Sequence, residues 1–248
     1  MRAVRLHADG LRLEQIPRPE PGPDEVLVRV RAAAITRDEL TWPTDRLPAI
    51  PSYELCGVVE STGEEVIALT PFDHDGVAAE WAVVPRSVLA SKPSRLSWEE
   101  AAALTMPGLT AWQGLVVHGR LTAGQRVLVT GARGGVGHVA VQLVSRLGAV
   151  LAEDGDTCDL LFDTVGGEAL ARNADGAARV VTIAAEAPGA HYFVVEPDGA
   201  QLAALPELLP QVDTVFPLED FDAAFARSAH RGKAGKVVLR VAKLSETA

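Results

Sequence analysis

The sequence predicts an α/β plus β protein, in which a β-rich domain built from both ends of the chain carries an inserted α/β domain. Short runs of Val, Leu and Ile, separated by Pro and Gly, extend to about Ala90. Alanine-rich, helix-forming sequence then begins at Ser97, and strand-like sequence returns near the end of the chain. We therefore expect a β domain over residues 1–96 and 211–248, and an inserted domain over residues 97–210.

Composition narrows the class of protein and its partners. The 248 residues are 48% hydrophobic, with a mean hydropathy of +0.13 and no apolar run long enough to span a bilayer, so a soluble globular protein without a membrane partner is expected. The net charge of -10 and the lack of a Lys/Arg cluster argue against nucleic acid. Only Cys56 and Cys158 are present, and no signal peptide precedes the first strand-like run, so we expect a reducing, cytoplasmic location.

In the β domain, strands are expected where runs of Val, Leu and Ile occur. These runs are Arg12–Ile16, Glu25–Ala33, Gly57–Glu60, Glu65–Leu69 and Ala79–Val84, with turns at prolines such as Pro43 and a short closing strand at Gly235–Val241. Ser97 and Glu100 form a capping box that begins the first helix. Pro107 and Gly108 then predict a break, followed by a second helix from Thr110 to His118.

The inserted domain centres on a strand, a glycine turn and a helix. Val127–Val129 predicts a buried strand, and Val136–Leu147 has the pattern of an amphipathic helix. Such a unit leaves backbone N–H groups at the helix N-terminus free to bind a pyrophosphate. We expect a dinucleotide to bind through Gly131, Arg133, Gly134, Gly135, Val136 and Gly137. Arg133 either contacts the phosphate or obstructs it.

Further motifs extend the pattern along the chain. They are PEPGPDEVLVRV (19–30), GVV (57–59), LSWEEAAAL (96–104), GLTAWQ (108–113), GARGGVG (131–137), DTVGG (163–167) and GKVVL (235–239). In this order they resemble the medium-chain dehydrogenase/reductase superfamily, and most of all its zinc-independent quinone oxidoreductase branch. The resemblance implies a GroES-like β domain, an inserted Rossmann-type domain and a small-molecule substrate in the cleft between them.

Two positions decide whether the catalytic zinc of some family members is expected. Those members hold zinc with a Cys and a His of the β domain, and the matching positions here are Thr36 and Tyr53. A hydroxyl and a phenol are poor zinc ligands at neutral pH. We therefore expect no zinc and no other metal site.

The resemblance also indicates candidate site residues. Those for catalysis are Thr36, Arg37, Asp38, Trp42, Tyr53 and Glu54; those near the cofactor are Thr110 for the nicotinamide and Gly166 and Gly167 for the ribose. Tyr53 either donates a hydrogen bond to a substrate carbonyl or is a packed tyrosine bonded to the backbone. Together with Glu39, the residues Thr36, Arg37 and Asp38 form either a catalytic cluster or a solvated loop. The two glycines are equally well explained as a turn at a strand end.

The segment after the amphipathic helix is short for the family. Leu160–Val165 resembles the family's fourth strand, which leaves only residues 149–158 between it and the helix. A full parallel strand there would require the chain to return about 16 Å in roughly five residues, whereas parallel neighbours normally need a connection of a dozen residues or more. We expect a direct loop and a shortened sheet that lacks its second and third strands, so Glu153 and Asp154 are not taken as ribose ligands.

The function expected first is NADPH-dependent reduction of a quinone or conjugated enone. Cofactor binding is expected to be weakened or lost, because the second and third strands that would support the adenosine are missing. Two alternatives stay open. One is a cofactor-independent enzyme, such as a cyclase, eliminase or isomerase, that acts on an apolar substrate such as a natural product. The other is a non-catalytic binding protein. The apolar run His191–Glu196 resembles the family's edge strand and indicates a homodimer.

Overall fold

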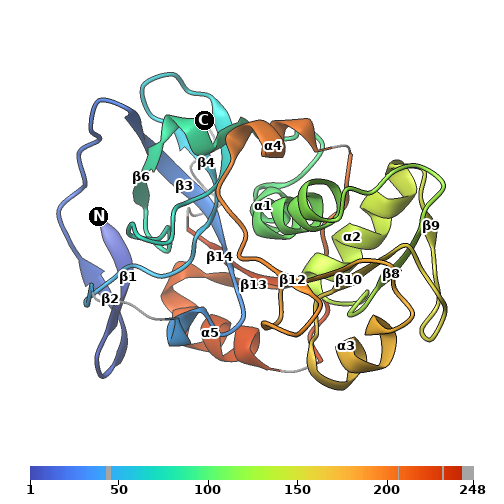
Figure 1. Ribbon diagram of the computed structural model, residues 1–248. Helices are drawn as coiled ribbons and strands as arrows, with labels where there is room; N and C mark the ends of the chain where they lie inside the picture. The colour runs from blue at the N-terminus through green and yellow to red at the C-terminus, as the bar shows by residue number, and fades with distance from the viewer. Residues whose placement is uncertain (43–45, 206, 231, 242–248) are drawn as a thin grey trace. The chain divides into compact units, whose positions relative to one another are not determined.

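The computed structural model describes residues 1–42, 46–205, 207–230 and 232–241 (Figure 1). The expected turn at Pro43 and the end of the expected β domain beyond Val241 lie outside these residues. The chain divides into two compact units, which are described separately. Unit 1 consists of Met1–Thr105, Pro197–Ala203 and the described residues from Gln211 on, and unit 2 consists of Met106–Glu196 and Ala204–Pro210.

Unit 1 is built on β-strands. They are β1 (Arg2–His7), β2 (Gly10–Gln15), β3 (Glu25–Ile35), β4 (Glu54–Val59), β5 (Glu65–Leu69), β6 (Trp81–Pro85), β7 (Leu89–Ser91), β13 (Val212–Pro217) and β14 (Lys236–Arg240). β1 and β2 form a hairpin, and the others form a seven-stranded sheet in the order β13-β14-β3-β4-β5-β7, with β6 also paired to β3. The expected strands are confirmed to within a few residues, whereas β13 was not foreseen because Asp213 interrupts its apolar pattern.

The pairing of β3 in the middle of this sheet positions the candidate site. Its C-terminal end runs antiparallel to the beginnings of two other strands: Ala34 lies opposite Glu54 of β4, and Ile35 lies opposite Val237 of β14. Buried Val, Leu and Ala side chains from these strands form one core with Phe225 of α5 (Phe221–Ala229), as expected for alternating apolar residues. Side chains at this end of the sheet are therefore held close together by a rigid scaffold.

A single helix, α1 (Trp98–Trp112), occupies the region where two were expected. The capping box is confirmed, since the Ser97 N–H donates to the Glu100 carboxylate at 2.8 Å and the Glu100 N–H to the Ser97 hydroxyl at 3.1 Å. The predicted break at Pro107 is wrong. Burial of residues on both sides of it, including the fully buried Leu109, outweighs the few kcal/mol that an interior proline costs. A π-helical segment, Gln113–His118, follows.

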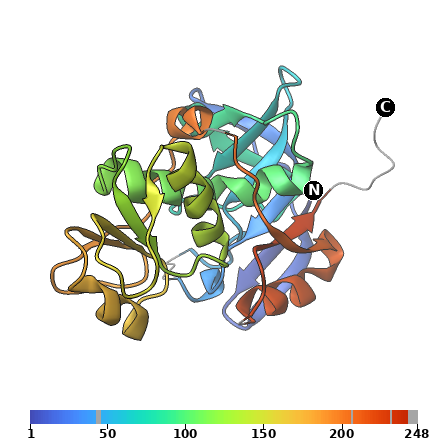
Figure 2. The same cartoon turned by 90° about the vertical axis from the view of Figure 1, so that its right-hand side faces the viewer.

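Unit 2 contains a five-stranded parallel sheet. Its elements are β8 (Arg126–Val129), α2 (Gly135–Arg146), β9 (Val150–Leu151), β10 (Leu160–Asp163), α3 (Gly167–Ala174), β11 (Val180–Thr182) and β12 (His191–Tyr192). The strand order is β12-β11-β10-β8-β9. From β8 the chain passes through α2 to one side, and from β10 through α3 to the other. Right-handed crossovers therefore place α2 and α3 on opposite faces of the sheet (Figure 2).

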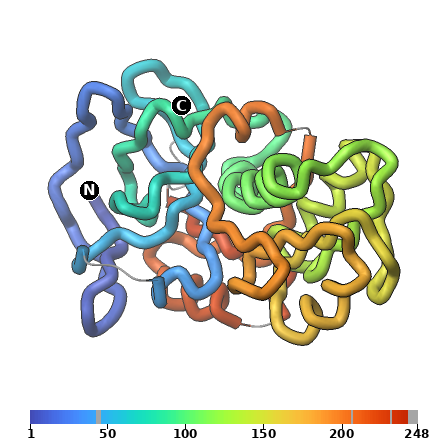
Figure 3. The backbone as a smooth tube through the Cα atoms, in the orientation of Figure 1, coloured from blue at the N-terminus to red at the C-terminus, as the bar shows by residue number. Residues whose placement is uncertain are grey.

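The stretch after α2 corrects one expectation and confirms another. A direct loop was expected, but Val150 and Leu151 pair in parallel with β8 as a two-residue strand. Between Gly148 and Asp159, all of which are described, no other strand occurs. The second strand is thus reduced rather than absent, and the third is absent. Because this strand has only two residues, the chain has to return only about 7 Å. The tube in Figure 3 turns back directly after β9.

The N-terminal end of β8 holds the returning loop. The Arg126 guanidinium pairs with the Asp156 carboxylate at 2.5 Å, and the Arg126 N–H donates to the Asp159 carboxylate at 2.7 Å. The chain therefore passes beneath the beginning of β8 before it enters β10.

Among the described residues, no helix combines the length and the apolar character needed to cross a membrane.

Candidate functional site

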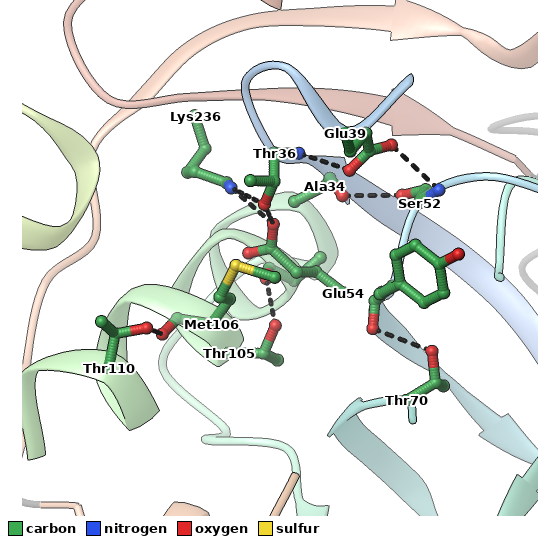
Figure 4. A network of polar contacts seen from close by, with 12 residues as sticks. Ala34, Thr36, Glu39, Ser52, Glu54, Thr70, Thr105, Met106, Thr110 and Lys236 are labelled. Atoms are coloured by element: carbon green, nitrogen blue, oxygen red, sulfur yellow. Dashed lines mark hydrogen bonds and ion pairs between the residues drawn. The ribbon is translucent and has the colours of Figure 1, made fainter. Parts of the chain in front are cut away.

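Unit 1 contains a polar cluster where β3, β4 and β14 meet. The Thr36 hydroxyl donates to the Glu54 carboxylate at 2.8 Å and accepts from the Lys236 ammonium at 2.9 Å, and that ammonium lies 2.5 Å from the same carboxylate. Figure 4 shows the three side chains pointing toward one another. Glu54 is fully buried, and the Lys236 side chain is 10% exposed. The three strand ends thus form an ion pair that is nearly sealed from water.

A second buried carboxyl, Glu39, lies in the turn after β3. Its two oxygens accept the backbone N–H groups of Thr36 at 2.8 Å and Ser52 at 2.9 Å. Burial raises the pKa of Glu39 to about 8, while the two N–H donors and the charge of Lys236 act in the opposite direction. Desolvation outweighs them because a buried carboxylate loses its hydration and the cluster supplies one ammonium for two carboxyls. Near neutral pH, Glu39 is therefore mostly the neutral acid.

One oxygen in this cluster lacks a hydrogen bond. Oε2 of Glu54 is buried and has no hydrogen-bond partner within the described parts of the chain, while Oε1 receives both Thr36 and Lys236. An unpaired buried acceptor is costly, and such atoms in folded proteins call for an explanation. This buried oxygen is therefore an acceptor without a donor, close to the ammonium of Lys236.

Beside the polar cluster lie three aromatic rings. Tyr53 stacks on Trp42 with ring centroids 5.9 Å apart, and Phe72 packs edge-on against both at 5.2 and 5.3 Å. The Tyr53 carbonyl accepts hydrogen bonds from the N–H and hydroxyl of Thr70, which fixes its backbone. Burial, and secondly the charge of Glu39, raises the pKa of Tyr53. Its hydroxyl makes no hydrogen bond to a described residue, so the neutral phenol is available as a donor.

The structure does not bring Arg37 and Asp38 into the polar cluster. Both side chains are exposed, and their ion pair of 3.4 Å is a contact between neighbours in sequence. Asp38 has φ of +63°, in the left-handed region, and directs the chain into the short 3₁₀ turn Glu39–Thr41. This geometry corresponds to a solvated loop beside the cluster.

The described residues contain no group of three or more His, Cys, Asp or Glu side chains that could hold a metal ion. At the two positions that match the family's zinc ligands, the Thr36 hydroxyl is engaged with Glu54 and Lys236, and Tyr53 is packed among aromatic rings. The absence of zinc stays a prediction.

In unit 2, the glycine turn lies at the C-terminal edge of the sheet, where the chain order reverses between β8 and β10. Gly131 has φ of +70°, and a Cβ atom there would lie 2.4 Å from the Thr164 hydroxyl. A Cβ at Gly137 would lie 2.1 Å from the Gly131 carbonyl oxygen. Only glycine fits both positions. Gly134 precedes α2 in an extended conformation, and no side chain caps the helix, so the first-turn N–H groups of α2 are open to an anion.

Asp163 at the end of β10 connects three strands at the same edge. This buried carboxylate accepts the Thr130 hydroxyl at 2.6 Å, the Thr182 hydroxyl at 2.7 Å and the Gly166 N–H at 3.0 Å. Gly166 and Gly167 have φ of +74° and +57°, conformations that favour glycine. Asp163 therefore anchors the loop after β10 to the ends of the neighbouring strands. This loop lies at the edge at which parallel α/β sheets bind ligands.

The other residues predicted for the cofactor are placed as follows. The buried Thr110 hydroxyl donates to the Met106 carbonyl at 2.6 Å, within α1. Arg133 is exposed in the glycine turn, and Gly135 and Val136 form the half-buried first turn of α2. The hydroxyl of Thr110 is thus engaged within its own helix, whereas the glycine turn is open to a ligand.

Two residues of these sites, Lys236 and Asp163, were not among the sequence-based candidates. Lys236 carried a signal, because a lysine at the beginning of a buried apolar strand requires a nearby anion. Asp163 also carried one, since a carboxylate that ends an apolar strand must find donors. Glu39 could not be separated from its charged neighbours in the sequence, because only the fold shows which of them is buried.

Comparisons with known proteins agree with these features. A family model for the alcohol dehydrogenase GroES-like domain matches residues 22–94. A "probable zinc-binding oxidoreductase, mitochondrial" of Arthroderma benhamiae is 30% identical over 94% of this chain and 94% of its own. That alignment runs over 311 residues, more than the 248 of this chain, so the fungal protein has residues without a counterpart here.

Two further proteins are similar over most of the chain. An NADPH-dependent alkenal/one oxidoreductase of Arabidopsis thaliana chloroplasts is 30% identical over 93% of this chain and 76% of its own. The quinone oxidoreductase of Thermus thermophilus, whose structure was also solved in complex with NADPH, is 30% identical with a TM-score of 0.81, covering 97% of this chain and 100% of its own.

Proposed function

Because the chain belongs to the medium-chain dehydrogenase/reductase superfamily of oxidoreductases, in its quinone oxidoreductase-like branch, we propose that it reduces a quinone or a conjugated enone with a weakly held nicotinamide cofactor. The observation that carries the proposal is the open glycine turn at the edge of the unit 2 sheet. The uncapped N-terminus of α2 follows this turn, beside the loop anchored by Asp163. The names of the quinone and alkenal relatives support the substrate class.

The residues present fit the diphosphate of such a cofactor. Gly131 lets the turn pack closely against Thr164 and Gly137 lets α2 begin close to the Gly131 carbonyl, while α2 presents unpaired N–H groups with the positive end of its dipole. A bound nicotinamide supplies a hydride to the electron-poor carbon of an enone or quinone. In this proposal Tyr53 donates its neutral phenol hydrogen to the substrate carbonyl, and Thr36, Glu54 and Lys236 hold the backbone that carries it.

A titration combined with a reduction assay tests this function. The purified protein is titrated with NADPH and NADH by calorimetry, and their oxidation is followed by the loss of nicotinamide absorbance with a panel of quinones and enones. We expect dissociation constants in the high micromolar to millimolar range and substrate-dependent oxidation. No heat change at millimolar cofactor, together with no oxidation, would exclude a nicotinamide-dependent reductase.

A second candidate, an enzyme that has lost its cofactor and catalyses a non-redox reaction on an apolar substrate, is favoured by one observation. The strand next to β8, β9, has only two residues. Because this strand supports the adenosine ribose in a dinucleotide fold, its shortening is expected to weaken dinucleotide binding. Turnover of a substrate with no nicotinamide present would support this candidate. If both assays fail, a non-catalytic binding protein is the interpretation left.

The proposal includes a homodimer formed through the edge strand β12 and the residues that follow it. Tyr192 is 37% exposed and Val194 is 59% exposed, next to an edge that has only β11 as a partner among the described strands of unit 2. An open, apolar edge favours pairing with a second copy. Light scattering on a size-exclusion column should give twice the chain mass, and Val194→Lys should shift it toward the monomer.

A further inference from the structure

We infer that unit 2 recognises a nicotinamide cofactor only as far as its phosphates. Reduced nicotinamide mononucleotide, which lacks the adenosine half, should then bind about as tightly as NADH or NADPH. The inference rests on the proposed function and deepens it, because it states which half of the cofactor the protein recognises. It is carried by the register of β9 and by the partners of the acidic residues that follow.

The features for the nicotinamide half are all present at one edge of the sheet. After β8 comes the glycine turn with the uncapped α2, and after β10 comes the loop of Gly166 and Gly167, anchored on Asp163. Because Gly131 approaches the Thr164 side chain so closely, these two loops are neighbours. They lie at the reversal of chain order, where parallel α/β sheets bind ligands.

On the other side of β8, the sheet stops before it reaches this edge. Leu151 of β9 lies opposite Val127, and the last hydrogen bond runs from the Ala152 N–H to the Val127 carbonyl at 2.8 Å. β8 itself continues to Val129. β9 therefore ends two residues, about 7 Å, short of the edge where the glycine turn begins. In a dinucleotide fold, the adenosine ribose rests against the end of this second strand, and here that support is missing.

Two acidic residues after β9, Asp154 and Asp156, are directed elsewhere. Asp154 accepts a hydrogen bond from Asn173 of α3 at 2.7 Å and pairs with Arg172 at 3.3 Å, and Asp156 pairs with Arg126 at the opposite end of β8. Both carboxylates are thus engaged with partners of the protein. Their charge, together with that of the exposed Glu153, would also oppose a 2′-phosphate. The protein is therefore expected not to prefer NADPH over NADH.

The test is a set of calorimetric titrations with the full chain at one salt concentration. The ligands are reduced nicotinamide mononucleotide, NADH, NADPH and ADP-ribose, the last carrying the adenosine half without nicotinamide. We expect the first three dissociation constants to agree within about tenfold and ADP-ribose to bind no more tightly than they do. NADH or NADPH binding more than about tenfold tighter than the mononucleotide would overturn the inference and leave the proposed function standing. No binding by any nicotinamide ligand would overturn both.

A matched pair of variants shows whether this binding occurs at the glycine turn. In Gly134→Asp, a carboxylate stands at the helix cap and competes with the phosphate for the first-turn N–H groups, while it also stabilises the helix. In Gly134→Ala, the same Cβ faces the Gly131 carbonyl oxygen at 3.2 Å without the charge. We expect Gly134→Asp to weaken all three nicotinamide ligands by about tenfold or more, by similar factors and with no fall in Tm. A loss confined to NADH and NADPH, or equal losses in both variants, would contradict the assignment.

Discussion

The ammonium of Lys236 lies 2.5 Å from the carboxylate of Glu54, at a point where strands from opposite ends of the chain meet. Both side chains are largely removed from water, and Thr36 bonds to both. A buried pair of this kind is costly to break on one side, because the remaining charge keeps its desolvation penalty without its partner. The pair therefore binds the beginning of β14 to the beginning of β4.

Replacing the cation alone should destabilise the protein strongly. We expect Lys236→Met, which keeps the apolar stem of the side chain, to lower the free energy of unfolding by about 3–5 kcal/mol, measured by urea denaturation. The double variant Lys236→Met/Glu54→Gln removes both charges and should recover much of that loss. If the double variant is as unstable as the single one, packing of the lysine stem and not the charge pair explains the effect.

Glu39 should make stability depend on pH. Its pKa is about 8 in the folded protein against an ordinary value of 4.5, so between these values the folded state binds a proton that the unfolded state lacks. Stability from this group is complete below about pH 4.5 and is lost as the pH rises through 8, by up to about 1.4 kcal/mol per pH unit. Glu39→Gln cannot titrate and should lack this slope.

Denaturation of the wild type and of Glu39→Gln from about pH 5 to about pH 8 measures the difference. Because the amide offers one acceptor where the carboxyl offers two to Thr36 and Ser52, the variant should be the less stable protein at the acidic end of this range. The gap should narrow as the pH rises. Parallel curves for the two proteins would show that Glu39 keeps the same charge across the range.

The parts of this fold that follow from periodicity and capping were predictable, and the parts that depend on pairing were not. The capping box at Ser97 and the strand–turn–helix around Gly131 are local patterns, and both are present. The two-residue strand at Val150 was missed because it depends on an available edge of β8 and not on its own sequence. Pro107 was taken as a helix break because the burial of the surrounding helix is a tertiary effect.

The candidate site shows the same division. Positions given by motifs, such as Tyr53 and the glycine turn, could be named from the sequence. The partners of Glu54 could not, because Thr36 and Lys236 are brought to it by strands that lie far apart along the chain. Which of several neighbouring acids is buried, as Glu39 is, depends on the path of the turn after β3 and is not encoded in a short pattern.

Asp163 should hold the loop after β10 in a fixed conformation. In Asp163→Asn, one acceptor oxygen replaces two, and the amide NH₂ group faces the donors of Thr130, Thr182 and Gly166. We expect a loss of about 1–3 kcal/mol and faster hydrogen exchange at the Gly166 amide. Thr182→Ser keeps the hydroxyl and serves as the control. Unchanged exchange at Gly166 in the Asn variant would show that the loop is held by other contacts.

Arg133 distinguishes two interpretations of the glycine turn. Its side chain is exposed beside the N-terminus of α2, and a guanidinium there suits a phosphate. We expect Arg133→Ala to weaken binding of reduced nicotinamide mononucleotide by about three- to tenfold, in line with an exposed charge–phosphate contact of about 1 kcal/mol. Arg133→Lys should lie between, and the difference should shrink at high salt. Tighter binding in the alanine variant would mean that the side chain obstructs the turn.

Tyr53 allows a catalytic role to be separated from a structural one. Its ring packs between Trp42 and Phe72, while its hydroxyl makes no hydrogen bond to a described residue. Tyr53→Phe should therefore change the free energy of unfolding by less than about 0.5 kcal/mol, yet lower kcat for a carbonyl substrate by about ten- to a hundredfold if the phenol donates to the developing oxyanion. Trp42→Phe, which alters a neighbouring ring and leaves the phenol in place, is the matched control and should raise KM more than it lowers kcat. Equal kcat values for Tyr53→Phe and the wild type would remove the phenol from the chemistry and leave Tyr53 as part of the aromatic packing.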